Sequence, residues 1–138
     1  MGRLTMSLSA RESYVLVTVA GEADTTVSVQ LRELLAAVLA GMRHVVVDLS
    51  GLGFIDAACV RVLVGACGAA EDAGGTLVLV TPQPIVARML RLCRADQLIA
   101  VYGSMTEVPP RWVLPAEETA APGPRSNHEY PVSLSGPG

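Results

Sequence analysis

The chain has 138 residues, of which 51% are hydrophobic, and it carries a net charge of −3 with a mean hydropathy of +0.45. Its longest stretch without a charged residue, Ala73–Ala87, spans 15 residues and contains two prolines. A membrane-spanning helix needs roughly 20 consecutive apolar residues, and the N-terminus lacks the apolar core of a signal peptide. Length and composition therefore predict a single cytoplasmic domain with no membrane insertion.

The charged and sulfur-containing residues argue against a nucleic-acid-binding protein and against a metal-binding protein. All ten basic residues are arginines, set against 13 acidic residues, whereas nucleic-acid binding requires a clustered positive field. The three cysteines, Cys59, Cys67 and Cys93, are odd in number and match no metal-binding spacing. We expect reduced thiols, no metal and no nucleic-acid partner.

A change in composition after Val108 predicts the domain organisation. Residues 109–138 contain seven of the nine prolines and three glycines, a composition that cannot bury enough apolar surface to offset the entropy of ordering. We expect a folded domain over residues 1–108 and a disordered Pro/Gly-rich tail over residues 109–138.

The first half of the domain predicts a hairpin, a helix and a buried strand. Alternating apolar residues predict strands near residues 4–8 and 14–19. A helical apolar period begins at Thr25 or Thr26 and continues to about Ala40, with Gly41 as the C′ glycine. Residues 44–49 are almost continuously apolar, which is typical of a parallel strand buried on both faces.

The second half continues the alternation of helices and strands. Asp56 is expected to cap a helix over residues 57–73, where Gly65 and Gly68 suggest close backbone packing. Residues 76–80 and 97–102 read as strands, separated by a helix that starts near Pro84. Residues 104–107 match a capping box.

The order β-β-α-β-α-β-α-β predicts an α/β fold. We expect a mostly parallel sheet of four to five strands, with an antiparallel first strand and helices covering it. The loops after the second, third and fourth strands are expected to lie on one rim, where such sheets place their functional residues.

Three carboxylates, Glu22, Asp24 and Asp56, fall in these loops. They fit two helix caps with one exposed charge, and the other interpretations are a metal site or a surface for a basic partner. Gly51 and Gly53 begin a G-x-G-x-x-G pattern, but Asp56 occupies its third glycine position, where a negative charge opposes an anionic ligand.

Cys59 is the one candidate nucleophile. It is predicted at the third position of its helix, where the helix dipole lowers the pKa of a thiol. A catalytic cysteine also needs a base within reach, but His44 is predicted at the opposite end of its strand and His128 lies in the tail. The residues therefore favour an interaction module without catalytic residues over an enzyme.

Over residues 4–108, the sequence resembles a STAS domain of the anti-sigma-factor-antagonist family. The resemblance rests on three segments in the family's order and spacing, which are residues 19–24 (VAGEAD), 45–56 (VVVDLSGLGFID) and 74–80 (GGTLVLV). It implies that the chain binds an anti-sigma factor that is also a serine kinase, and so regulates sigma-factor-dependent transcription. It further implies that such a kinase can phosphorylate a Ser or Thr at the start of the second helix and switch the antagonist off.

The family motif at that helix reads roughly Asp-Ser-Ser/Thr-Gly, whereas this chain has Asp56-Ala57-Ala58-Cys59. The position of the phosphoacceptor is thus held by Ala58, which has no hydroxyl. The resemblance implies a partner-binding surface of Asp24, Asp56, Ala57, Ala58 and Cys59.

We expect a module that the kinase cannot switch at the usual site, and that binds its partner constitutively or acts as a scaffold or decoy. Ser50, Thr25 and Thr26 stay open as substitute phosphorylation sites. The alternative is a STAS subunit of a lipid-transport or stress-signalling complex.

Overall fold

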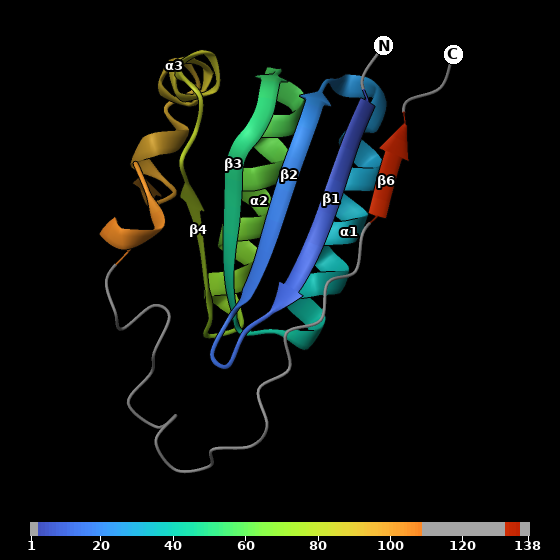
Figure 1. The fold of residues 1–138 in the computed structure, drawn as a ribbon. Coiled ribbons are helices and arrows are strands. Elements are labelled where there is room, and N and C mark those ends of the chain that lie inside the picture. The colour runs from blue at the N-terminus through green and yellow to red at the C-terminus, as the bar shows by residue number, and fades with distance from the viewer. Residues whose placement is uncertain (1–2, 109–131, 136–138) are drawn as a thin grey trace.

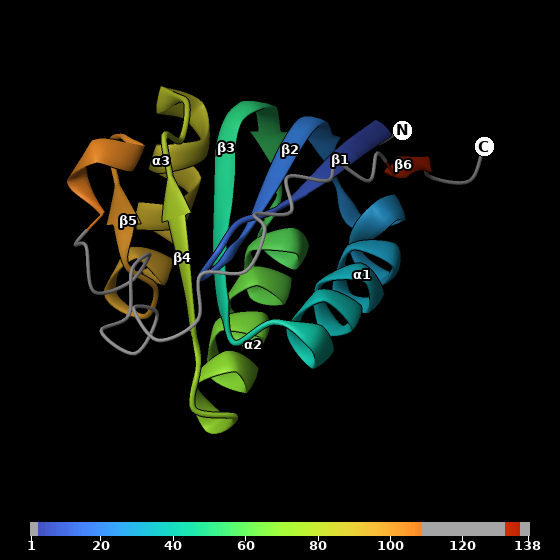
Figure 2. The ribbon, with the colours of Figure 1, turned by 60° about the horizontal axis from the view of Figure 1, so that its bottom comes forward.

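The computed structural model describes residues 3–108 and 132–135, which contribute to a six-stranded sheet in the order β5-β4-β3-β2-β1-β6 (Figures 1 and 2). Strands β1 (Arg3–Ala10) and β2 (Val15–Ala23) form an antiparallel hairpin. The next three strands run parallel to β2, and they are β3 (His44–Ile55), β4 (Thr76–Val80) and β5 (Val101–Tyr102). The predicted α/β class, with a mostly parallel sheet and an antiparallel first strand, is confirmed.

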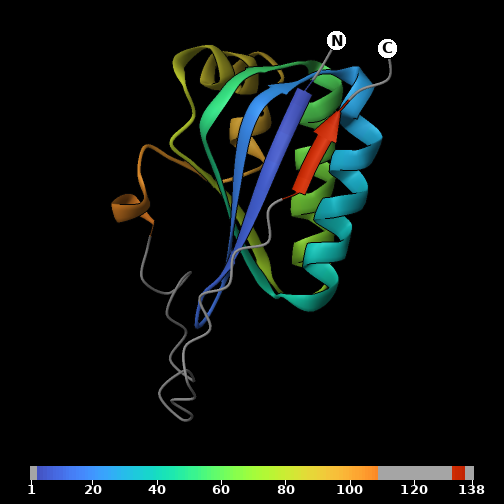
Figure 3. The same ribbon diagram turned by 45° about the vertical axis from the view of Figure 1, so that its right-hand side comes forward.

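Helices α1 (Ser28–Gly41) and α2 (Ala57–Asp72) lie side by side on one face of the sheet (Figure 3). The third helix, α3 (Pro84–Leu92), has the predicted proline at its start. The described residues also form three single-turn 3-10 helices, namely η1 (Thr25–Val27), η2 (Ala95–Gln97) and η3 (Met105–Glu107). No helix among the described residues is long and apolar enough to cross a bilayer.

Residues 45–47 of β3 and 77–80 of β4 are buried on both faces, as the apolar composition of these segments predicts. On the helix-covered face, alternate residues such as Val47 and Leu79 pack in the main core with α1 and α2. On the opposite face, Val46, Val78 and Val80 pack against Val108 in a second, smaller cluster. The second face of these strands is thus covered by the end of the domain, not by a helix layer.

Several predicted boundaries are wrong. Strand β3 continues six residues past Leu49, because residues 51–55 still pair with β2 through two register shifts. The predicted last strand is reduced to two residues, since residues 95–97 form η2. Gly41 is the last residue of α1 and has no positive φ, so it is not a left-handed C′ glycine. The hydroxyl of Ser104 makes no capping bond to the backbone, so the capping box does not form.

Gly21 has a backbone geometry that only glycine tolerates easily. Its φ is +103°, and a Cβ built there would lie 2.3 Å from the carbonyl oxygen of Arg3 on the paired strand. This glycine allows β1 and β2 to remain paired up to Glu22, one residue before β2 ends and the candidate site begins.

The predicted disordered tail requires a correction. Strand β6 (Val132–Ser135) lies within it and pairs antiparallel with β1, from Arg3↔Ser135 to Met6↔Val132. The physical reason is that β1 would otherwise be an open edge, with backbone groups available for pairing. The other residues of the predicted tail lie outside the described ones.

Candidate functional site: the junction of the loops before α1 and α2

Two loops meet where β2 and β3 end together, with Ala23 opposite Ile55 in the parallel register. The backbone N–H of Asp56 donates to the carbonyl oxygen of Ala23 at 3.0 Å. The loop before α1 and the loop before α2 are therefore joined at their first residues. We call Asp24, Thr25, Asp56 and Cys59 the loop junction, because side chains of these four residues bridge the two loops or cap the helical segments that follow.

Asp56 is the centre of the loop junction. One carboxylate oxygen accepts from the backbone N–H of Cys59 at 3.0 Å and caps α2, as its position in the sequence predicts. The other oxygen accepts from the hydroxyl of Thr25 at 2.8 Å, across 31 residues of sequence. Asp56 thus starts its own helix and also fixes the loop that precedes α1.

Asp24 caps the other loop. Its carboxylate accepts from the backbone N–H of Thr26 at 2.9 Å and so begins the 3-10 turn that leads into α1. The hydrogen bond from the Thr26 side chain lowers the pKa of this carboxyl below its ordinary value. Of the interpretations considered for the acidic residues, the structure confirms helix capping for Asp24 and Asp56, and it leaves Glu22 exposed on β2.

Cys59 is buried at the third position of α2, and its thiol donates to the carbonyl oxygen of Asp24 at 3.2 Å. Burial, together with the nearby carboxylates of Asp56 and Asp24, raises the pKa of this thiol to about 12. The sequence-based expectation of a lowered pKa is therefore wrong, because desolvation and negative neighbours outweigh the helix dipole.

No histidine among the described residues lies near this thiol. His44 begins β3, and the 11 steps from there to Ile55 correspond to roughly 35 Å of strand. Its Nδ1 lies 2.9 Å from the hydroxyl of Thr76, at the far end of the sheet. His128 lies outside the described residues.

The third predicted loop does not share this rim. Strand β4 ends at Val80, opposite Asp48, whereas β3 continues to Ile55. The loop after β4 therefore lies beside the middle of β3, where the side-chain amide of Gln83 donates to the carbonyl oxygen of Ser50 at 2.7 Å. Ser50, Gly51 and Gly53 all lie within β3, so the glycines form no phosphate-binding loop.

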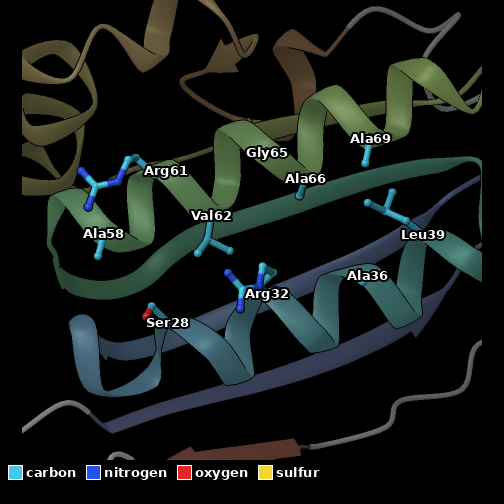
Figure 4. Close-up of a pocket in the computed structure, with 10 residues that line it drawn as sticks. All are labelled: Ser28, Arg32, Ala36, Leu39, Ala58, Arg61, Val62, Gly65, Ala66 and Ala69. Atoms are coloured by element: carbon cyan, nitrogen blue, oxygen red, sulfur yellow. The ribbon is translucent and has the colours of Figure 1, made fainter.

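Ala57 and Ala58 form the first turn of α2, and both are half-buried. Ala58 lines a groove of about 500 Å³ between α1 and α2, which we call the α1–α2 groove (Figure 4). The structure thus brings Asp24, Asp56 and Cys59 together and places Ala58 just outside them on the groove. No group of three or more His, Cys, Asp or Glu that could hold a metal occurs among the described residues.

Sequence reasoning missed two residues of this region. Thr25 appeared only as a helix start and a candidate phosphorylation site, whereas its hydroxyl holds Asp56. Gln83 was only a loop residue, whereas its amide bonds to β3. Both bonds connect segments more than 30 residues apart, so no local pattern could reveal them.

Comparisons with known proteins agree with this fold. Residues 6–101 match the family model described as "Mlab, STAS domain", so the chain belongs to the STAS domain family. No curated protein matches the sequence significantly.

Solved structures show the same fold. An anti-sigma factor antagonist from Mycobacterium paratuberculosis superposes with a TM-score of 0.65 at 21% identity, covering 75% of this chain and 88% of that one. An anti-sigma-factor antagonist (STAS) domain protein from Planctomyces limnophilus gives 0.61 at 18% identity, with 74% and 92% covered. An RsbS variant from Moorella thermoacetica gives 0.56 at 26% identity, with 68% and 82% covered.

Proposed function

We propose that this chain is a non-catalytic, cytoplasmic interaction module that binds a serine-kinase-type anti-sigma factor and thereby regulates sigma-factor-dependent transcription. The proposal is carried by the loop junction, where the carboxylates of Asp24 and Asp56 cap two parallel-strand loops and lie beside the first turn of α2. The antagonist names of several structural neighbours support it.

We further propose that the module cannot be switched at the usual position. Ala58 carries no hydroxyl, and Thr25, the nearest one on the loop junction, donates its hydrogen bond to Asp56. A phosphate on Thr25 would place about −1.5 to −2 charges directly against a carboxylate. The same contact argues against Thr25 as a substitute phosphorylation site.

Binding is tested with the purified full chain and each kinase-type anti-sigma factor of the host, by isothermal titration calorimetry. We expect one of them to bind in the presence of nucleotide. Failure of every candidate to bind would overturn the proposed function.

Switching is tested separately, by incubating the chain with the bound kinase and ATP and then analysing it by mass spectrometry. We expect no added phosphate. Phosphate on Ser50, Thr25 or Thr26 would contradict the unswitchable module, and Ala58→Ser is the matched variant that we expect to gain a phosphate.

The second candidate function is a STAS subunit of a lipid-transport or stress-signalling complex. It is favoured by the name of the matching family model, which is Mlab rather than an antagonist. The genes beside the coding sequence separate the two, because a transporter operon supports this candidate and a kinase-type anti-sigma factor supports the first. A pull-down from the native host gives the same distinction at the protein level.

A further inference from the structure

The α1–α2 groove follows the solvent side of two parallel helices for about three turns. On α1 it is lined by Ser28, Arg32, Ala36 and Leu39, a spacing that keeps one stripe of the helix facing it. On α2 its lining runs from Ala58 to Ala69, 11 steps and about 16 Å of helix. A helix of about 16 Å from another protein would therefore fit along the groove, in contact with both α1 and α2.

The floor of the groove is left open by small side chains on α2. Gly65 lies in the middle of α2, and a Cβ built there would meet nothing within 4 Å. The same is true of Gly68, so the predicted close backbone packing at these glycines is wrong. A glycine inside a helix costs about 1 kcal/mol relative to alanine, and nothing in the described chain uses the space that Gly65 leaves.

One end of the groove is positively charged. Arg32 extends from α1 towards α2, and Arg61 lies along the first turns of α2 beside Ala58 (Figure 4). Both side chains are exposed, and neither forms an ion pair or hydrogen bond with another described residue. None of the described residues that line the groove is acidic.

We propose that the α1–α2 groove binds a helix of the partner protein, with an acidic end between Arg32 and Arg61 and a small apolar face along Gly65. Charge complementarity selects the acidic end, because both arginines lie in the N-terminal half of their helices and no acidic residue lines the groove beside them. The open space at Gly65 selects an apolar helix face, which packs into a groove between helices.

This inference rests on the proposed interaction function and adds the chemistry of the partner's contact segment. A direct test uses two synthetic helical peptides of about 16 residues with an Ala/Leu face, matched to the length of the groove and identical except that one end carries either a Glu pair or a Lys pair. Each is titrated into the ¹⁵N-labelled full chain, and amide shifts are followed by NMR. We expect the Glu peptide to shift the signals of Gly65 and Ala66, and the Lys peptide to leave them unchanged.

The variant Arg32→Glu/Arg61→Glu should weaken binding of the Glu peptide at least tenfold. Both positions lie in the N-terminal half of their helices, where an acidic residue is compatible with the dipole, and a thermal melt verifies folding. The matched control is Arg88→Glu/Arg91→Glu on α3, which makes the same charge change on exposed residues outside the groove and should change the affinity less than twofold. The variants Gly65→Leu and Gly68→Leu test the shape of the groove in the same way. Only Gly65 lines the groove, so only Gly65→Leu should weaken binding of the Glu peptide.

Equal binding of both peptides, or equal weakening by the α3 control, would overturn the proposal. Phosphatidylglycerol vesicles serve as the alternative anionic probe, and groove shifts caused by vesicles but not by the Glu peptide would also overturn it. Because the peptide test needs no anti-sigma factor, its failure is distinguishable from failure of the proposed function.

Discussion

The loop junction and the α1–α2 groove are adjacent, yet they use their polar groups differently. At the junction, the side chains of Asp24, Thr25, Asp56 and Cys59 all make hydrogen bonds within the chain. In the groove, the guanidinium groups of Arg32 and Arg61 bond to no described residue. A residue with an internal role changes stability whenever it is substituted, whereas a groove residue can change binding alone. The following experiments test that distinction.

The largest effect is expected at Cys59, because burial and two carboxylates raise the pKa of its thiol to about 12. Relative to the ordinary value of 9.0, a pKa of about 12 lowers the thiolate fraction about a thousandfold at mildly alkaline pH. We expect iodoacetamide to alkylate Cys59 far more slowly in the folded chain than in the urea-unfolded chain, as followed by mass spectrometry. Similar rates in both states would contradict a buried thiol at the junction.

The raised pKa also predicts how stability depends on pH. The folded-state pKa of Cys59 lies above the unfolded one, so the thiol's contribution is fully present below the unfolded pKa and is lost as pH rises from about 9 towards 12. Urea melts of the wild type and Cys59→Ala at pH 7 and pH 10 measure it. The wild type should lose more stability than Cys59→Ala over this interval.

Next in size is Asp56→Ala, which removes the cap of α2 and the acceptor of the Thr25 hydroxyl together. Losing a cap costs about 1 kcal/mol, and a further unmade hydrogen bond raises the total to about 2 kcal/mol of unfolding free energy. Chemical denaturation measures the change, with Asp56→Asn as the control that retains a capping oxygen. Arg32→Ala, in the groove, should change stability by less than about 0.5 kcal/mol. Equal losses at both positions would remove the distinction between the two regions.

Ala58→Asp tests the place where the loop junction and the α1–α2 groove meet, because Ala58 lies beside the first and lines the second. An acidic residue in the first turn of a helix is stabilising by a few tenths of a kcal/mol, so the melting temperature should not fall. The introduced carboxylate would also lie three residues before Arg61 on α2 and compete for its guanidinium group. We expect affinity for the Glu peptide and for the anti-sigma factor to fall about tenfold by calorimetry, with Ala58→Asn as the uncharged control. Unchanged affinity would place the interface elsewhere.

Much of the fold was predictable because its signals are local. The apolar run at residues 76–80 predicted β4 with its observed bounds. The position of Asp56 before an apolar helical period predicted the cap of α2. The sequence misleads where glycine and proline interrupt a pattern that tertiary contacts complete. Gly51 and Gly53 suggested a loop, yet β2 pairs with residues 51–55 of β3. The proline-rich tail suggested disorder, yet residues 132–135 pair with the open edge of β1.

The site was less predictable than the fold. Asp24 and Asp56 could be placed on neighbouring loops, because both follow parallel strands. The Thr25 bond and the raised pKa of Cys59 depend on distances between segments that only the folded chain brings together. The open space at Gly65 was equally hidden, since the sequence shows a glycine but not what lies opposite its Cα.

The smallest predicted effect is that of replacing Gly65 or Gly68 with alanine. It tests whether Gly65 only lowers the stability of α2 or also leaves space for a bound helix. Gly65→Ala and Gly68→Ala should each raise the unfolding free energy by about 0.5–1 kcal/mol, because a Cβ meets nothing within 4 Å at either position. The corresponding rise in melting temperature is roughly 2–8 °C for a domain of this size. We expect Gly65→Ala to stabilise the chain but to lower its affinity for the Glu peptide. Gly68→Ala should stabilise the chain and leave that affinity unchanged. This result would show that the glycine at position 65 lowers the stability of α2 and keeps the groove open for binding. If both variants bind the Glu peptide with unchanged affinity, the groove tolerates a methyl group at position 65. The difference between the two positions must then be measured with the larger Gly65→Leu and Gly68→Leu substitutions.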